Sequence, residues 1–176
     1  MATAAAAGLS WRALVALLPV RFDDARFWPR AGLGLALRWA ALELDWWWLR
    51  DAVTGAVVSV LDAVGVGTAA PARATLALAS GGAAFNVTVS CTHVEVFALL
   101  APLVVDRTVS LRRNVASLTA LSCALAAFAV LRISAAVAGY QAGVPWLWAH
   151  DVVLGVGYFV VMATVLKRGA WARPRV

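Results

Sequence analysis

Residues 114–137 read NVASLTALSCALAAFAVLRISAAV, and this stretch decides how the chain folds. A helix needs about 20 mostly apolar residues to cross a bilayer, so the stretch predicts a membrane span. Two further spans are predicted, from Thr92 to Val105 and from about Leu147 to Leu166. Residues 1–20 loosely resemble a signal peptide, but their apolar run is short, Arg21 interrupts it and no clean cleavage site follows, so we expect a retained, partly interfacial N-terminal segment.

A fourth and weaker candidate span runs from Ala31 to Leu49. It carries Arg38, Glu43 and Asp45, which must face partners or water if this segment crosses the membrane. Arg38 and Asp45 are two helical turns apart and therefore share a face. They are expected to form a buried pair that helps the helices pack.

The composition supports a membrane environment. Of the 176 residues 63% are hydrophobic, whereas a soluble domain of this length is usually about half apolar. The net charge of +6 comes mostly from short basic clusters between apolar runs, which are typical of topology signals and not of nucleic-acid binding. The two cysteines, Cys91 and Cys123, lie in different settings, so neither a disulfide nor a zinc motif is predicted.

The basic clusters predict the orientation. With four spans, eleven of the fifteen basic residues lie on one side, which should be cytoplasmic together with the C-terminus. These are Arg12, Arg21, Arg26, Arg30, Arg107, Arg112, Arg113, Lys167, Arg168, Arg173 and Arg175. The protein is therefore predicted to be multi-pass in the plasma membrane.

The region between the first span and Cys91 is predicted to lie outside the membrane. Residues 51–67 are amphipathic and are expected to form an interfacial helix. After Pro71 the pattern alternates every second residue through 75–79 and again through 85–90, around Ser80-Gly81-Gly82. That pattern predicts a small extracytoplasmic β-hairpin. The fold class is thus an all-α integral membrane protein of about four transmembrane helices, with one interfacial helix and one hairpin.

Three reactive side chains are predicted to lie at one depth near the outer surface. The separations Cys91–Arg107, Arg132–Arg113 and His150–Lys167 are 16, 19 and 17 residues, or about 24 to 29 Å of helix. Cys91 is expected at a helix N-terminus, where free amide donors suit an anionic sulfur. Cysteine, histidine and arginine together supply a nucleophile, an acid/base and an oxyanion stabiliser. The other interpretation is that Arg132 snorkels to the headgroups and His150 caps a helix.

Three neighbouring residues are candidate supporting groups. Glu95 shares a helical face with Cys91 and would orient Arg132 or a substrate amine, or form an ion pair. Asp151 is expected to cap a helix rather than to form a triad with His150, since adjacent residues on a helix diverge by about 100°. His93 and Cys91 point apart on a helix, so no metal site and no cofactor are predicted.

Residues 65–167 resemble the exosortase/archaeosortase family of membrane cysteine transpeptidases. The resemblance rests on NVTVSC at 86–91, Arg112-Arg113-Asn114, Leu131-Arg132-Ile133 and His150-Asp151, in that order. The chain is then a single membrane domain, 1–176, in which residues 1–64 supply an N-terminal span and interfacial helices.

The resemblance implies a function and a set of roles. Family members cut proteins near a C-terminal sorting signal, which consists of a motif, a transmembrane helix and a basic tail. They act on the outer face of the membrane and pass the new C-terminus to an acceptor. By resemblance, Cys91 is the nucleophile, Arg132 the oxyanion stabiliser and His150 the acid/base, and the partner is a membrane-anchored protein substrate.

This chain departs from the family pattern at two places. The family usually has Ser-Gly after the cysteine, where this chain has Thr92-His93, and Asn three residues before the arginine, where this chain has Ala129. These departures keep open an alternative function, a catalytically inactive relative that serves as a membrane scaffold or binding partner.

Overall fold

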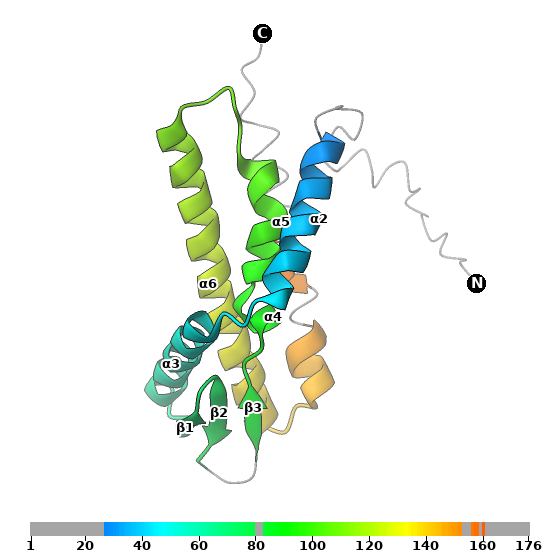
Figure 1. The fold of residues 1–176 in the computed structure, drawn as a ribbon. Helices are drawn as coiled ribbons and strands as arrows, with labels where there is room; N and C mark the ends of the chain where they lie inside the picture. The colour runs from blue at the N-terminus through cyan, green and yellow to red at the C-terminus, as the bar shows by residue number, and fades with distance from the viewer. Residues whose placement is uncertain (1–26, 80–82, 153–155, 159, 161–176) are drawn as a thin grey trace, which may run out of the picture.

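The computed structural model describes residues 27–79, 83–152, 156–158 and 160. The architecture has two parts along one long helix, α6 (Leu111–Gln141). Alongside its first half lie α2 (Phe27–Glu43) and α5 (Val94–Val104), and beside its second half lie α3 (Trp47–Ala63) and a small sheet (Figure 1). Both parts therefore share a single helix as their common support.

Helix α6 begins and ends at recognisable signals. Ser110 is the N-cap, with extended backbone and a side chain that accepts a hydrogen bond from the Arg113 amide. At the other end Gly143 has φ 88°, and the Val144 amide donates to the Gly139 carbonyl, as is usual where a glycine terminates a helix. Among the described residues α6 is the one helix long and apolar enough to cross a membrane, judged by length and composition.

The sheet has three antiparallel strands in the order β1 (Thr68–Ala72), β2 (Thr75–Leu78) and β3 (Ala84–Asn86). Leu76 is opposite Phe85 in the β2–β3 pair, and Leu78 is opposite Thr68 in the β1–β2 pair. The hydrophobic core lies between the sheet, α3 and α6, and it contains Val57, Leu61, Leu76, Val87 and Val137. Alternating burial along β2 follows the period of two expected for a strand with one covered face.

Two helices pack with exceptionally close backbones. At Gly34 of α2 an added Cβ atom would lie 2.3 Å from the carbonyl oxygen of Leu99 in α5. A side chain at this position would force the helices apart, so the glycine permits the contact. Leu100 in α5 and Leu121 and Leu125 in α6 form a second buried cluster, which joins α5 to α6.

Several expected boundaries are corrected by the structure. The span expected over Thr92–Val105 is α5, which has 11 residues and begins only at Val94, because His93 adopts a left-handed backbone at φ 59° and interrupts the helix. The weaker span ends at Glu43 and not at Leu49. The helix expected over 51–67 is α3, which begins earlier, at Trp47. It ends at Ala63, ahead of Gly65 at φ 81°.

The hairpin and the last span also differ from expectation. The hairpin is a three-stranded sheet, and its last strand ends at Asn86, after which Val89–Thr92 form a short helix, α4. The last span begins as a π-helix, η1 (Leu147–Val152), and residues 156–158 and 160 are helical. The rest of that span and residues 1–26 lie outside the described part of the chain.

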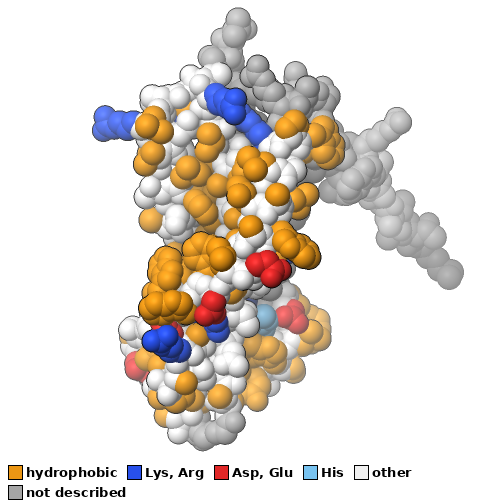
Figure 2. All heavy atoms as spheres, viewed as in Figure 1, with side chains coloured by type: hydrophobic (Ala, Val, Ile, Leu, Met, Phe, Trp, Pro, Cys, Tyr) orange, Lys and Arg blue, Asp and Glu red, His pale blue; other side chains and the backbone are white. Residues whose placement is uncertain are grey.

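Charged side chains are gathered in separate zones on the face seen in Figure 2. Basic side chains lie at the end of the molecule where α5 joins α6, while acidic, basic and histidine side chains lie around its lower half (Figure 2). Between these zones the visible surface is hydrophobic or uncharged. The candidate site lies at the lower zone, where the helical part meets the sheet.

Candidate functional site

Arg132 and His150 are in direct contact. Arg132 is on α6 and only 2% exposed, and its Nη1 lies 3.0 Å from His150 Nε2. The guanidinium can only donate, so Nε2 accepts this bond and the ring proton is on Nδ1. Two of the three residues predicted to meet are therefore joined, although eighteen residues separate them in sequence.

Asp151 extends this contact into a chain of three side chains. His150 Nδ1 donates to Asp151 Oδ1 at 2.6 Å, so Asp151 orients the imidazole. The expectation that Asp151 would point away from His150 is therefore wrong. That expectation assumed the geometry of an α-helix. Residues 147–152 instead form a π-helix, which turns less per residue and keeps adjacent side chains closer. Trp146 also stacks on His150, with ring centroids 4.8 Å apart.

Cys91 lies on the neighbouring helical turn and has a different partner. It is the third residue of α4, and its Sγ lies 3.4 Å from Thr88 Oγ1. The side chain is half-buried and packs against the core cluster that contains Val87 and Ile133, the residue after Arg132. No hydrogen bond joins Cys91 to His150 in the described part of the chain. The cysteine is thus near the arginine-bearing turn but is not paired with its expected base.

A second polar cluster lies on the other side of this turn, around His93. Tyr158 bridges the cluster, with its hydroxyl 2.9 Å from His93 Nδ1 and donating to Glu95 Oε1 at 3.2 Å. His93 is fully buried and stacks on Phe128 of α6 with ring centroids 5.2 Å apart. Sequence reasoning missed Tyr158 because it lies 65 residues from His93 in an apolar segment, where nothing in the pattern distinguishes it.

Among the described residues Glu95 does not form the ion pair that was one of its possible roles. Arg38 and Arg132 both lie close enough to act on it electrostatically, but neither makes a salt bridge with it. The expected Arg38–Asp45 pair is also absent from the described residues, because α2 ends before Asp45 and Asp45 pairs with Arg50 instead. Glu95 Oε2, His93 Nε2, Arg132 Nε and Ser134 Oγ are buried side-chain atoms without a hydrogen-bond partner among the described residues.

The residue types present point to acid/base and nucleophilic chemistry. Within the described ranges no three His, Cys, Asp or Glu side chains are grouped so that they could hold a metal ion. Cys123 is exposed on α6, nine residues before Arg132 on the same helix. Cysteine, histidine, aspartate and arginine are sufficient for acyl transfer, provided that the thiol can reach the imidazole.

The chain shows no significant match to a protein-family profile, to a curated protein or to a solved structure. The side-chain arrangement therefore has to support any functional argument by itself.

Proposed function

We propose that this protein is a membrane-embedded cysteine protease or transpeptidase that acts on the extracytoplasmic face. The observation that carries the proposal is the hydrogen-bonded chain from Arg132 through His150 to Asp151 beside the turn that bears Cys91. A base held by a carboxylate and accompanied by a cation is the arrangement that acyl transfer by a thiol requires. The substrate in this proposal is a membrane-anchored protein whose C-terminal signal has a motif, a transmembrane helix and a basic tail.

The reaction assigns one task to each side chain. His150 Nε2 takes the proton of the Cys91 thiol, and the sulfur attacks the substrate carbonyl carbon. Arg132 stabilises the oxyanion. The peptide C–N bond then breaks, His150 returns the proton to the leaving amine, and a thioester remains. Water or an acceptor amine gives a proton to His150 and attacks the thioester, which releases the product and the thiol.

One rearrangement precedes the first step. Cys91 Sγ has to leave Thr88 Oγ1, and Arg132 Nη1 has to leave His150 Nε2, because that nitrogen must be free to accept the thiol proton. Both changes are rotations about side-chain bonds, and substrate binding would supply the driving force as the carbonyl oxygen takes over the guanidinium.

The backbone at position 93 supports the resemblance to the exosortase family. His93 has φ 59°, in the left-handed region that glycine adopts without strain. The family usually has glycine at this position, two residues after the cysteine. This chain therefore keeps the backbone conformation that explains the family's glycine, and it gains a buried imidazole there.

Surface chemistry supports the membrane placement. Helix α2 exposes Leu33, Leu35 and Trp39 at 54%, 59% and 68%, which suits lipid better than water. The zone without charged side chains between the basic end and the site has the order expected of a bilayer-spanning region (Figure 2). In this proposal the basic end is cytoplasmic and the sheet is outside.

A second candidate function is an inactive scaffold that holds a membrane helix without cutting it. Two contacts favour it: Cys91 is hydrogen-bonded to Thr88, and the basic nitrogen of His150 is occupied by Arg132. In this case the same site would bind the partner, but no thioester would form.

Co-expression with a tagged protein that ends in a motif, an apolar helix and a basic tail tests the proposal. Mass measurement should find the tagged protein shortened by the wild-type chain and by Cys123→Ala, and intact with Cys91→Ala. Processing that survives Cys91→Ala contradicts the proposed chemistry. Stable co-purification of an uncut partner with the wild-type chain favours the scaffold.

A further inference from the structure

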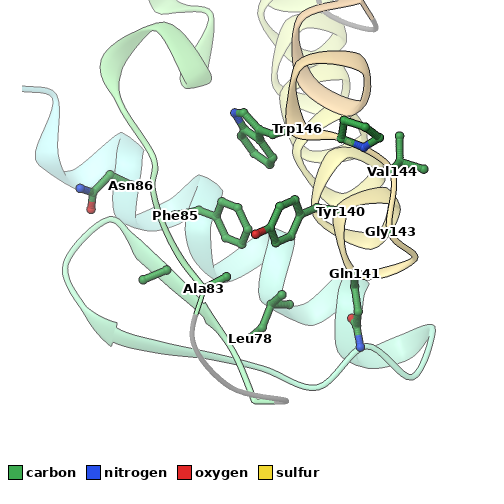
Figure 3. Close-up of a pocket in the computed structure, with 11 residues that line it drawn as sticks. Leu78, Ala83, Phe85, Asn86, Tyr140, Gln141, Gly143, Val144 and Trp146 are labelled. Carbon is green, nitrogen blue, oxygen red and sulfur yellow. The ribbon is translucent and has the colours of Figure 1, made fainter.

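A cleft opens next to the candidate site, between β3 and the connection from α6 to η1. Its volume is about 990 Å³. One wall is formed by Ala84, Phe85 and Asn86, and the opposite wall by residues 140–141 and 143–146 (Figure 3). The cleft contains none of the side chains to which the proposed reaction assigns a role.

One wall of this cleft is the edge of the sheet at β3, which has no strand partner on that side among the described residues. The Leu78 amide donates to the Ala83 carbonyl and the Val87 amide to the Ala74 carbonyl, so the odd-numbered residues of this segment bond toward β2. In an antiparallel pair the alternate residues face the other way. The backbone N–H and C=O groups of Ala84 and Asn86 therefore point away from β2, and β3 is the last strand on that side.

Aromatic rings connect the cleft to the candidate base. Phe85 and Tyr140 line the cleft and contact each other edge to face, with ring centroids 5.5 Å apart (Figure 3). Phe85 also stacks on Trp146 at 4.9 Å, and Trp146 stacks on His150 at 4.8 Å. The far end of β3 leads into the turn that holds Cys91, only five residues beyond Asn86. A ligand in the cleft would therefore lie between the proposed base and the strand that leads to the proposed nucleophile.

We infer that this cleft binds an extended peptide segment of the protein substrate, which adds to the edge of β3 as a fourth strand. The inference rests on the proposed function and names the part of the site that reads the substrate. Outward backbone groups at Ala84 and Asn86 bond to the peptide main chain, and the aromatic rings of Phe85, Tyr140 and Trp146 hold an apolar or aromatic side chain.

A peptide fits this cleft better than a lipid or a small molecule does. Alternating donors and acceptors along a strand edge are complementary to another peptide backbone, whereas an acyl chain offers them no partner. The polar groups of Asn86 and Gln141, which also line the cleft, suit a ligand with amide groups. A peptide bond of the substrate, next to the segment bound in the cleft, is then brought toward Cys91, whose sulfur attacks it.

The test measures peptide binding without catalysis. The full-length Cys91→Ala variant in phosphatidylcholine nanodiscs is titrated with fluorescein-labelled, capped heptapeptides of alanine with a central Phe, Leu or Ser, and anisotropy is followed. A control peptide carries the Phe sequence with all central amides N-methylated. We expect the Phe and Leu peptides to bind more tightly than the Ser peptide, and the N-methylated peptide to lose at least tenfold in affinity.

Protein variants locate the site. Ala84→Pro removes one outward N–H at an edge position where proline is tolerated, and should weaken binding by about five- to tenfold relative to Ala84→Val. Tyr140→Ala should weaken binding of the Phe peptide by about tenfold. Trp148→Ala, an exposed tryptophan that does not line the cleft, is the matched control and should bind as before.

Binding that ignores N-methylation or Ala84→Pro overturns strand addition, and so does the absence of binding at about 1 mM peptide, the weak end of specific affinities. These results are separable from the proposed reaction. Peptide binding without any processing of the tagged protein contradicts only the reaction. Processing with an unchanged KM in Ala84→Pro and Tyr140→Ala contradicts only the cleft.

Discussion

Arg132 Nη1 lies 3.0 Å from His150 Nε2, so in this structure a buried cation occupies the nitrogen that the proposed reaction needs as a base. The contact has two consequences. It fixes the tautomer of His150, and in the proposed reaction it gives Arg132 a second role beside oxyanion stabilisation, because the guanidinium keeps the base inactive until substrate arrives.

Replacing Arg132 by lysine tests this double role. Lysine retains the charge but lacks the planar guanidinium, so it cannot serve the base and the oxyanion in the same geometry. We expect kcat for processing of the tagged protein to fall about a hundredfold with little change in KM. Arg112→Lys, at the remote basic end, is the control and should process normally. Full activity in Arg132→Lys would show that the positive charge alone is sufficient, and an equal loss in both variants would show that the effect is not specific to the site.

Asp151→Asn tests whether Asp151 orients the base. The amide still accepts from His150 Nδ1, but it loses the charge that stabilises the imidazolium, so processing should slow by about tenfold or more. Glu43→Gln, which neutralises an exposed carboxylate at the end of α2, should leave the rate unchanged. Mass spectrometry of the product over time measures both. Full activity in Asp151→Asn would show that the charge of Asp151 is not needed by the base.

Position 93 offers a matched pair of substitutions. His93→Ala and His93→Gly both remove the buried imidazole, but alanine keeps the cost of a left-handed backbone, which is about 1 kcal/mol. We therefore expect His93→Gly to unfold at a higher temperature than His93→Ala in the same detergent. Circular dichroism during heating measures the difference. The reverse order would contradict the φ of 59°.

The Tyr158 hydroxyl should contribute to stability. Tyr158→Phe leaves His93 Nδ1 and Glu95 Oε1 buried without their common partner, which costs about 1–3 kcal/mol. Tyr140→Phe, at an exposed ring outside the cluster of His93 and Glu95, is the comparison. A lower unfolding midpoint in urea should appear only for Tyr158→Phe. Equal midpoints would mean that the cluster contributes nothing.

Two glycine substitutions in α2 distinguish the effect of helix propensity on stability from the effect of the close contact between helices. Gly34→Ala places a methyl group against the Leu99 carbonyl and should destabilise the α2–α5 contact by about 1–3 kcal/mol. Gly32→Ala meets no atom within 4 Å and should be neutral or slightly stabilising. Thermal unfolding of both variants decides the matter, and similar destabilisation in both would contradict the close approach.

Much of the fold could be predicted from the sequence, because its signals are local. The apolar run at 114–137 lies within α6, and the alternation at 75–79 follows β2. Boundaries were less predictable where one residue overrides the pattern. His93 interrupts the helix expected from Thr92 onward, and no rule of composition gives a histidine a positive φ.

The site was predictable in its residue types and less so in its contacts. The charge pattern and the residue spacing predicted that Arg132 and His150 lie at the same depth, and in the structure their side chains are in contact. The Asp151 bond depends on a π-helix, and the Tyr158 bridge on tertiary packing over 65 residues, so neither leaves a periodic trace in the sequence. Cys91 bonds to Thr88 three residues away, a choice between side-chain rotamers that no sequence pattern encodes.

Helix α6 has 31 residues and is therefore about 46 Å long, roughly half as long again as the hydrocarbon core of a bilayer. Arg132 is in its second half, where Ile133 and Val137 share a hydrophobic core with α3 and the sheet. In the proposed orientation, any tilt that adapts this helix to a thicker or thinner membrane moves the arginine, the cysteine turn and the peptide cleft together. Hydrophobic mismatch would then shift the height above the lipid at which a substrate is cut. Bilayer thickness would therefore select among substrates by the length of the segment between their transmembrane helix and the cleavage motif.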